Sequence, residues 1–311
     1  MVEIAAGVVL FNPDDVERVK KCLSNVARQV EKVYIYDNST ASVELEYPDN
    51  CVYLTENANL GIAHALNVIM RKAKEDGYKW VITMDQDSIM PLGMIESFKT
   101  IIEHSSDRLG IICPQVIDRR RIYSRPVSPN GTQQMTDAIT SASCTSVKAW
   151  EEVGAFDEWL FIDLVDNEFS KRLTCSGYQI LRVNKWILDQ EFGVIEPKTR
   201  KKQIFWMKAS QILHVPNLAK FAYRKKVSPF RVYYVHRNII YINRKLKKYG
   251  TVGFGSFGCK SYLGFFLCYT VPSVLRAQDK KRVMLSIVHG INDGLHAHPS
   301  QWISPREAPV D

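Results

Sequence analysis

The 311-residue sequence predicts an open α/β sheet, because short apolar strands alternate with amphipathic helices through its first half. No run reaches the roughly 20 apolar residues that a membrane-spanning helix needs. The 46% hydrophobic content is enough for a sizeable core. Open α/β sheets bind ligands beyond the carboxyl ends of their strands, so functional residues are expected at that edge.

The alternation begins with a strand over Ile4–Phe11, after which Asn12 and Pro13 are typical of a helix start. Apolar residues then recur at helical spacing up to Val30, which predicts the first helix. The next expected elements are strands at 33–36 and 51–55, a helix at 62–75, a strand at 80–84, a helix at 94–103 and a strand at 109–114.

Beyond residue 114 the alternation breaks. The polar stretch 115–137 contains Arg119-Arg120-Arg121 and predicts a long loop, which is either a binding segment or simple disorder. A strand at 138–147 and a short helix at 150–156 should follow. We expect a catalytic α/β domain over 1–225 and a C-terminal helical region over 226–311.

The net charge of +8 favours an anionic partner, such as a nucleotide-sugar, a lipid phosphate, a membrane surface or a nucleic acid. The absence of a nucleic-acid motif argues against the last of these. The absence of GxGxxG after the first strand argues against a dehydrogenase. The seven scattered cysteines show no CxxC spacing and no signal peptide is evident, so we expect a cytoplasmic protein with reduced thiols.

Two aspartates, Asp85 and Asp87, directly follow the expected strand at 80–84. Carboxylates at a strand end can both turn onto one hard divalent cation, and such a cation readily bridges a diphosphate. Acidic residues are also common in turns, so the pair alone leaves a purely structural role open.

A second acidic segment contains Asp163, Asp166 and Glu168 at the expected start of a helix. Carboxylates are favoured there by exposed backbone N–H groups, so a simple capping role is one interpretation. A general base of an enzyme is the other.

The order of five segments resembles that of a known enzyme family. They are Val8–Pro13, Tyr36–Ser39, Asn57–Ala63, Met84–Ser88, and Gly154–Glu158 leading into Phe161–Asp166. In this order they resemble the large inverting family 2 of GT-A glycosyltransferases, and within it the bacterial rhamnosyltransferase-like branch. The resemblance covers residues 4–250 and implies a GT-A fold, a Rossmann-like open mixed sheet with helices on both faces.

The resemblance implies a donor site at the carboxyl edge of the sheet. Asp37 would accept a hydrogen bond from N3–H of uracil or thymine, and Asn59 and Gly61 would let the backbone pass close to the nucleoside. Asp85 would lie near the ribose or sugar, and Asp87 would coordinate Mg²⁺ or Mn²⁺ on the diphosphate. A turn aspartate and a helix-capping turn are the structural alternatives.

The family's base position falls on Asp166, which would take the proton from the acceptor hydroxyl as that oxygen attacks the anomeric carbon. Asp163 is the rival, because one carboxylate could orient the acceptor while the other removes the proton.

Gln190 stands where this branch usually carries the metal-binding histidine of a His-x-x-Gly pattern. The implied metal ligands are therefore Asp87, Asp85 and Gln190, and an amide oxygen suits Mg²⁺ better than a transition metal. His214, in an apolar run that reads as a strand, is an alternative ligand. Arg237 matches an Arg-Asn pair of the branch and could reach the donor diphosphate.

The C-terminal third predicts a helix over 229–249, an apolar run over 262–275 with basic flanks, and a last helix toward residue 291. Such a run suits an interfacial helix that places Phe265 and Phe266 at the lipid headgroups. Packing on the catalytic domain or a homodimer interface is the alternative.

These observations lead to an inverting, metal-dependent glycosyltransferase for bacterial cell-surface polysaccharide synthesis. The expected donor is dTDP-L-rhamnose, and the expected acceptor is a saccharide, carried on a lipid diphosphate at the inner face of the plasma membrane. UDP-glucose, UDP-galactose and UDP-galactofuranose remain alternative donors. A catalytically silent, nucleotide-sugar-binding scaffold subunit is the alternative from another class.

Overall fold

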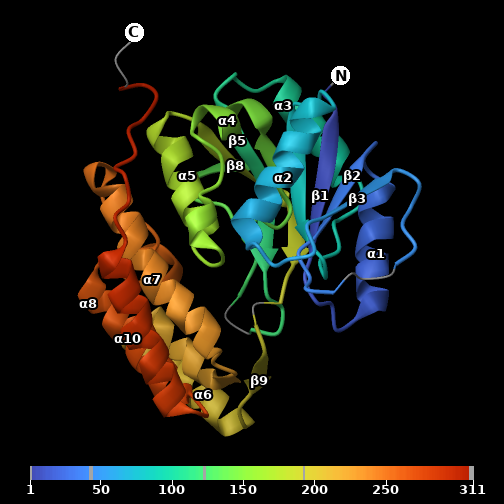
Figure 1. Cartoon of the computed structure of the whole chain (residues 1–311). Coiled ribbons are helices and arrows are strands. Elements are labelled where there is room, and N and C mark those ends of the chain that lie inside the picture. Colours follow the sequence, from blue (N-terminus) through green and yellow to red (C-terminus); the bar gives the residue numbers. More distant parts are fainter. Residues whose placement is uncertain (1, 42–44, 122–123, 192, 308–311) are drawn as a thin grey trace. The chain divides into compact units, whose positions relative to one another are not determined.

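The computed structural model describes residues 2–41, 45–121, 124–191 and 193–307 (Figure 1). The chain forms two compact units. The first comprises residues 1–119, 125–190 and 303–311, and the second comprises 120–124 and 191–302. This division concerns packing alone, so the expected functional boundary at residue 225 remains a prediction.

The first unit contains a mixed sheet of the expected type. Within the described residues its strand order is β3-β2-β1-β4-β7-β5-β8-β6, and only β7 and β6 run antiparallel to their neighbours. The strands are β1 (Ile4–Leu10), β2 (Val33–Asp37), β3 (Cys51–Thr55), β4 (Trp80–Asp85), β5 (Leu109–Ile117), β6 (Thr132–Met135), β7 (Ser143–Ser146) and β8 (Gln179–Asp189).

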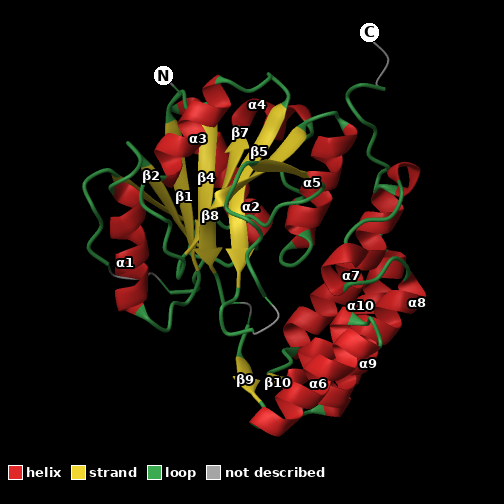
Figure 2. Cartoon of the chain, turned by 180° about the vertical axis from the view of Figure 1, so that it is seen from behind, coloured by secondary structure: helices red, strands yellow, loops and turns green. Residues whose placement is uncertain are grey.

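Helices cover both faces of this sheet, as Figures 1 and 2 show from opposite sides. α1 and α3 share one apolar core with the sheet, whereas α2 packs on the other face, where a Cβ at Gly7 would overlap Ile69. The helical elements of this unit are α1 (Val16–Ala27), α2 (Ile62–Glu75), α3 (Met94–Glu103), α4 (Val147–Glu152), the 3₁₀ turn η1 (Glu158–Leu160) and α5 (Val165–Cys175).

The segment between β5 and α4 differs from the expectation. The predicted loop over 115–137 contains the end of β5 and all of β6, while Ile122 and Tyr123 lie outside the described residues. The predicted strand over 138–147 is shorter in the structure, where only β7 is a strand. It ends at Ser146 because this residue caps α4, and its hydroxyl accepts a hydrogen bond from the N–H of Ala149 at 3.3 Å. β8 was not expected, since its apolar residues are interrupted by Arg182, Asn184 and Lys185.

The second unit is mainly helical, and its longest helices, α7 and α10, pack together. Gly290 and Gly294 allow the approach, since a Cβ at Gly294 would lie 2.7 Å from the carbonyl oxygen of Arg237. The main elements are β9 (Ile195–Pro197), α6 (Arg200–Ile212), the 3₁₀ segment η2 (Pro216–Ala222), β10 (Tyr223–Lys225), α7 (Pro229–Lys245), α8 (Tyr262–Phe265), α9 (Val271–Arg276) and α10 (Lys280–His296).

Three expectations for this unit differ from the structure. The apolar run 262–275 is not one helix, since a π-helical turn at Phe266–Thr270 separates α8 from α9. Phe265 is only 4% exposed and packs on His236 at 5.2 Å between ring centroids, so it belongs to the core rather than to a lipid boundary. Phe266, in contrast, is 51% exposed. His214 lies in the turn after α6 with a φ of 51°, not in a strand.

All seven cysteines are free thiols, as expected from their spacing. No helix in the described part of the chain has the length and apolarity needed to cross a membrane.

Candidate functional site

The carboxyl ends of the parallel strands bring Asp37 and Asp85 to the same edge of the sheet. β1 lies between them, with Leu10 paired to Asp37 on one side and Val9 paired to Asp85 on the other. With neighbouring strands about 4.8 Å apart, the two backbones are separated by about 10 Å. This edge is where an open α/β sheet binds its ligand.

Asp37 is completely buried and braces the ends of β2 and β3. Its Oδ1 accepts a hydrogen bond from the N–H of Ser39 at 2.9 Å, and its Oδ2 accepts one from the hydroxyl of Tyr53 at 2.8 Å. The resemblance also assigns Asp37 a contact with the nucleobase of the donor. That contact stays a prediction.

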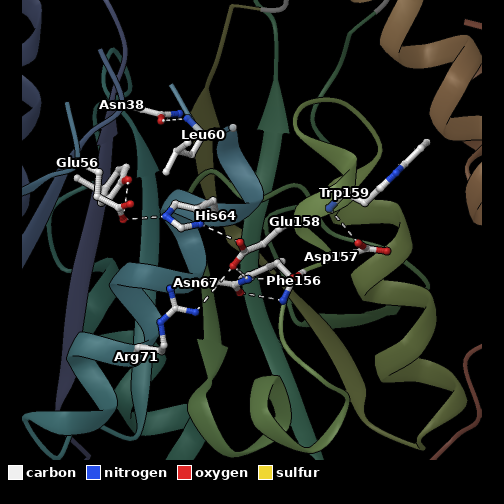
Figure 3. Close-up of polar contacts among 12 residues, drawn as sticks. Asn38, Glu56, Leu60, His64, Asn67, Arg71, Phe156, Asp157, Glu158 and Trp159 are labelled. Atoms are coloured by element: carbon white, nitrogen blue, oxygen red, sulfur yellow. Dashed lines mark hydrogen bonds and ion pairs between the residues drawn. The ribbon is translucent and has the colours of Figure 1, made fainter. Parts of the chain in front are cut away.

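Side chains that the sequence did not single out tie the loops at this edge together. The Oε1 atom of Gln86 accepts a hydrogen bond from the N–H of Phe11 at 2.8 Å, which joins the loops after β4 and β1. The Oδ1 atom of Asn38 accepts one from the N–H of Leu60 at 2.9 Å (Figure 3). The edge is therefore preorganised by amide side chains.

Gly61 precedes α2 and lies directly against Phe161, which belongs to the segment before Asp163 and Asp166. The N–H of Ile62 donates a hydrogen bond to the carbonyl oxygen of Phe161 at 2.7 Å. Gly61 has a φ of +91°, and a Cβ there would lie 2.6 Å from that same oxygen. Gly61 thus allows its backbone to pass close to the second acidic segment. A close approach of the same backbone to a nucleoside remains a prediction.

Asn59 stabilises the turn before Gly61. Its Oδ1 atom accepts a hydrogen bond from the N–H of Gly61 at 3.1 Å, so the side chain closes an Asx turn. The turn considered for this segment is therefore present, but Asn59 does not cap α2, whose N-cap is Gly61 without a side-chain hydrogen bond. A role of Asn59 toward a nucleoside stays a prediction.

The segment that carries the second acidic group has an unusual backbone. Phe161, Asp163 and Leu164 have φ values of 38°, 66° and 63°, which side chains rarely adopt. Such conformations persist only where the surrounding structure imposes them, and they are concentrated at functional sites.

An ion pair anchors the helix that follows this strained backbone. The buried guanidinium of Arg172 donates two hydrogen bonds of 2.7 Å to the carboxylate of Glu168, and another of 2.6 Å to the carbonyl oxygen of Ala155. Removing either partner would leave a buried charge uncompensated. Glu168 is therefore a structural residue, and Asp163 and Asp166 are left as candidate bases.

Asp166 has the electrostatic properties of a general base. Burial raises the pKa of its carboxyl to about 6, the N–H of Asn167 at 2.9 Å opposes this rise, and the charges of Asp137 and Asp163 add to it. The side-chain amide of Asn167 donates a hydrogen bond of 3.1 Å to Oδ2 of Asp137, which holds that second carboxylate nearby. A pKa near the working pH is what proton abstraction requires.

A histidine that the sequence reasoning missed, His64, lies between Glu56 and Glu158 (Figure 3). Nδ1 of His64 is 2.8 Å from Oε2 of Glu158, and its Nε2 is 2.8 Å from Oε1 of Glu56. Burial lowers the pKa of His64, but the two carboxylates outweigh this effect and hold the pKa above its usual value. His64 thereby connects the end of β3 to η1.

Asn67, one helical turn further along α2, fixes the same segment. Its Nδ2 donates to the carbonyl oxygen of Phe156 at 2.9 Å, and its Oδ1 accepts from the N–H of Phe156 at 2.9 Å and from the indole of Trp150 at 3.0 Å. Asn67 could have been identified from the sequence, because it is a polar residue within the apolar face of the predicted helix and buried polar groups need hydrogen-bond partners.

Gln190 and Asp85 are in direct contact. Nε2 of Gln190 donates a hydrogen bond to Oδ2 of Asp85, and the backbone N–H of Gln190 donates to the carbonyl oxygen of Ile117 at 2.9 Å. The Oε1 atom of Gln190 is buried and has no hydrogen-bond partner among the described residues. A buried oxygen left without a partner is costly, so this atom is suited to meet a ligand.

Arg237 lies on α7 in the second unit. Its guanidinium lies 4.6 Å from the ring centroid of Tyr234 and its Nε donates a hydrogen bond to Oδ1 of Asn238 at 3.0 Å. The expected contact of Arg237 with a donor diphosphate stays a prediction.

The chain is similar to known proteins both in sequence and in fold. Residues 7–143 match the family model described as Glycosyl transferase family 2. This segment belongs to that family. A curated relative, the dTDP-rhamnosyl transferase RfbF of Shigella flexneri, is 28% identical over 196 residues, which are 57% of this chain and 64% of the relative.

A solved structure of GalNAc-T7 with UDP, GalNAc and Mn²⁺ is similar with a TM-score of 0.53 at 11% sequence identity, over 87% of this chain and 57% of that chain. The GT-A fold that the sequence predicted is thereby confirmed. The chain spans less than two thirds of the length of both proteins.

The residues at the end of β4 fit the divalent cation that the resemblance implies. Asp85, Asp87 and the unpartnered Oε1 of Gln190 supply oxygen donors, which hard cations such as Mg²⁺ prefer. The described residues contain no group of three or more His, Cys, Asp or Glu side chains placed to hold a metal. The remaining coordination positions would therefore be left to water and to the diphosphate of a donor.

Proposed function

We propose that the protein is an inverting, metal-dependent glycosyltransferase that uses a nucleotide-diphospho-sugar, with dTDP-L-rhamnose as the favoured donor. The main support is the contact of Gly61 and Ile62 with Phe161, because it joins the donor edge of the sheet to the loop that carries Asp163 and Asp166. The similarity to a dTDP-rhamnosyl transferase favours this donor over UDP-hexoses and UDP-galactofuranose.

In this mechanism the donor diphosphate lies at Asp85, Asp87 and Gln190. A divalent cation, when bound there, offsets the negative charge that grows on the leaving diphosphate. The carboxylate of Asp166 accepts the proton of an acceptor hydroxyl while that oxygen forms a bond to the anomeric carbon. The bond to the diphosphate breaks on the opposite face, so the configuration at this carbon is inverted. Asp163 orients the hydroxyl.

The proposed acceptor is a saccharide carried on a lipid diphosphate, in the synthesis of a bacterial surface polysaccharide. Phe266 and Leu267, which are exposed on the second unit, support contact with a membrane surface. The same residues would equally suit a homodimer interface. A silent scaffold is disfavoured, because such a subunit has no need for an aspartate with the raised pKa of Asp166.

A thermal-shift panel tests this proposal. The purified protein is mixed with dTDP-rhamnose, UDP-glucose, UDP-galactose, UDP-galactofuranose, dTDP or UDP, each with Mg²⁺, Mn²⁺ or EDTA. We expect stabilisation by dTDP-rhamnose that EDTA abolishes, since a ligand that binds only the folded state raises its stability. A metal-dependent shift with a UDP-sugar in place of dTDP-rhamnose would assign a different donor, and no shift with any of these ligands would contradict the proposed donor site.

A further inference from the structure

Basic side chains from separate segments of the second unit gather around η2 and the β9–β10 pair. β10 pairs with β9, and the N–H of Lys198 donates a hydrogen bond of 3.0 Å to the carbonyl oxygen of Ala222. The guanidinium of Arg276 lies 5.5 Å from the ring centroid of Phe221, which follows Lys220. The residues of this basic cluster are Arg121, Lys198, Lys202, Lys220, Arg224 and Arg276.

Two lysines of the basic cluster are held in an environment that disfavours their charge. Burial lowers the pKa of Lys220, and the charges of Arg276 and Arg121 lower it further. Burial also lowers the pKa of Lys198, together with Lys202, Arg224 and Arg276. An anion bound among these groups would relieve their mutual repulsion.

Nearby acids do not neutralise the two lysines of the cluster, Lys198 and Lys220. Neither Lys198 nor Lys220 forms an ion pair within 4.0 Å with an acid in the described part of the chain. Glu196 is opposite Arg224 in the β9–β10 register, but it is exposed and forms no ion pair with Arg224. Lys198 and Lys220 therefore have unused capacity for an external anion.

A line of aromatic rings leads from the surface to the cluster. Phe205 is 63% exposed and lies 5.2 Å from Trp206, which in turn lies 5.1 Å from Phe221, the ring under Arg276. Phe205 and Trp206 come from α6, a helix that buries none of its described residues. Leu275, next to Arg276, is also largely exposed. An apolar surface that ends at fixed positive charges suits an amphiphile with an anionic head.

We propose that Lys198, Lys220 and Arg276 bind the phosphate or diphosphate head of a lipid, with Phe205 and Trp206 against its apolar part. Arginine and lysine side chains recognise phosphate oxygens through charge-assisted hydrogen bonds. This site lies wholly within the second unit, whereas Asp85, Asp87 and Gln190 lie in the first. Binding at this site requires neither a divalent cation nor sugar transfer, so it can be tested independently of the proposed activity.

Calorimetry with inorganic pyrophosphate in the presence of EDTA tests the anion site. Lys220→Met and Lys198→Met should each weaken pyrophosphate binding by about 10-fold or more, the loss expected for one charge-assisted hydrogen bond. Lys281→Met, on the exposed start of α10, makes the same change in net charge and should leave binding intact. Asp87→Asn should also leave it intact. Equal affinity in all four variants, or a loss confined to Asp87→Asn, would overturn the site.

Vesicle sedimentation distinguishes a lipid from a soluble diphosphate. Wild type and Lys281→Met should sediment with phosphatidylcholine vesicles that contain phosphatidic acid but not with pure phosphatidylcholine, and both cluster variants should lose this association. Pyrophosphate binding without any vesicle association would contradict the lipid part of the proposal. If Lys220→Met fails to fold, the more accessible Lys198→Met decides both measurements.

Discussion

Gly61 and Phe161, a hundred residues apart in the chain, are in backbone contact. A Cβ at Gly61 would lie 2.6 Å from the carbonyl oxygen of Phe161, and the N–H of the next residue, Ile62, donates a hydrogen bond to that oxygen at 2.7 Å. The contact joins the donor edge to the strained backbone before Asp166. The position of the proposed base therefore depends on the start of α2.

Gly61→Ala should disturb both halves of the site. The added methyl group would overlap Phe161 at a backbone φ of +91°, so we expect a loss of unfolding free energy of about 2 kcal/mol or more. Transfer should fall more than donor affinity, because the loop that moves carries the base. The matched control is Gly131→Ala, which also has a positive φ but open space around it. Equal losses in the two variants would show that backbone strain alone, not Phe161, is responsible.

The bridge from Glu56 through His64 to Glu158 should be stronger when His64 is protonated. The two carboxylates hold the pKa of His64 above its usual value of about 6.5. The bridge therefore contributes its full stabilisation below about pH 6.5, and this stabilisation is lost as the pH rises through the pKa of His64 in the folded protein. We expect His64→Gln to cost about 1 kcal/mol at pH 6 and less at pH 9, a modest value because Glu56 is exposed. Chemical denaturation at the two pH values measures this difference.

His104→Gln is the control for that experiment, since His104 bonds only to a carbonyl of its own helix. A cost for His64→Gln that does not change with pH would mean that the bridge is held by neutral hydrogen bonds.

Asp166→Asn should keep donor binding and lose roughly 10² to 10⁴-fold in transfer rate, the contribution typical of a general base. Donor affinity by calorimetry and turnover by product release separate the two effects. Near-normal turnover would assign the base to Asp163, and Asp163→Asn should then show the loss instead.

The pH dependence of the stability of Asp166→Asn provides an independent test of the raised pKa of Asp166. The pKa of Asp166 is raised from 3.8 to about 6, so its charge destabilises the folded protein at higher pH and has little effect below about pH 3, where the group is mostly protonated in both states. Asp166→Asn should therefore be more stable than wild type at pH 8, and this difference should nearly vanish at pH 3. Lower stability at pH 8 would show that the carboxylate is structurally required.

Asp137→Asn should shift the acid limb of the activity profile. The charge of Asp137 contributes to the raised pKa of Asp166, so its removal should lower that pKa and keep the enzyme active at a lower pH. Asp107→Asn, a distant exposed carboxylate, should leave the limb unchanged. An unshifted limb in Asp137→Asn would separate Asp137 from the base.

The sequence predicted the helices and strands whose apolar residues recur with strong periodicity. It did not predict elements whose formation depends on contacts with distant parts of the chain. The helices Ile62–Glu75 and Met94–Glu103 end where their apolar faces end. β6 has no buried residue, so no pattern indicated that it would pair with β8. Asp85 and Asp87 were recognisable from their place after a strand. The proximity of Gln190 to Asp85, more than a hundred positions away, followed only from the family resemblance, because no local sequence pattern links two such distant residues.

The central claim is that Asp87 and its neighbours hold a donor diphosphate through a divalent cation. Calorimetric titration of dTDP-rhamnose into wild type and Asp87→Asn, each with Mg²⁺ and with EDTA, tests it most directly. We expect Mg²⁺ to strengthen binding to wild type and to have little effect on Asp87→Asn. Equal strengthening in both proteins, or an affinity for wild type that EDTA leaves unchanged, would contradict the account.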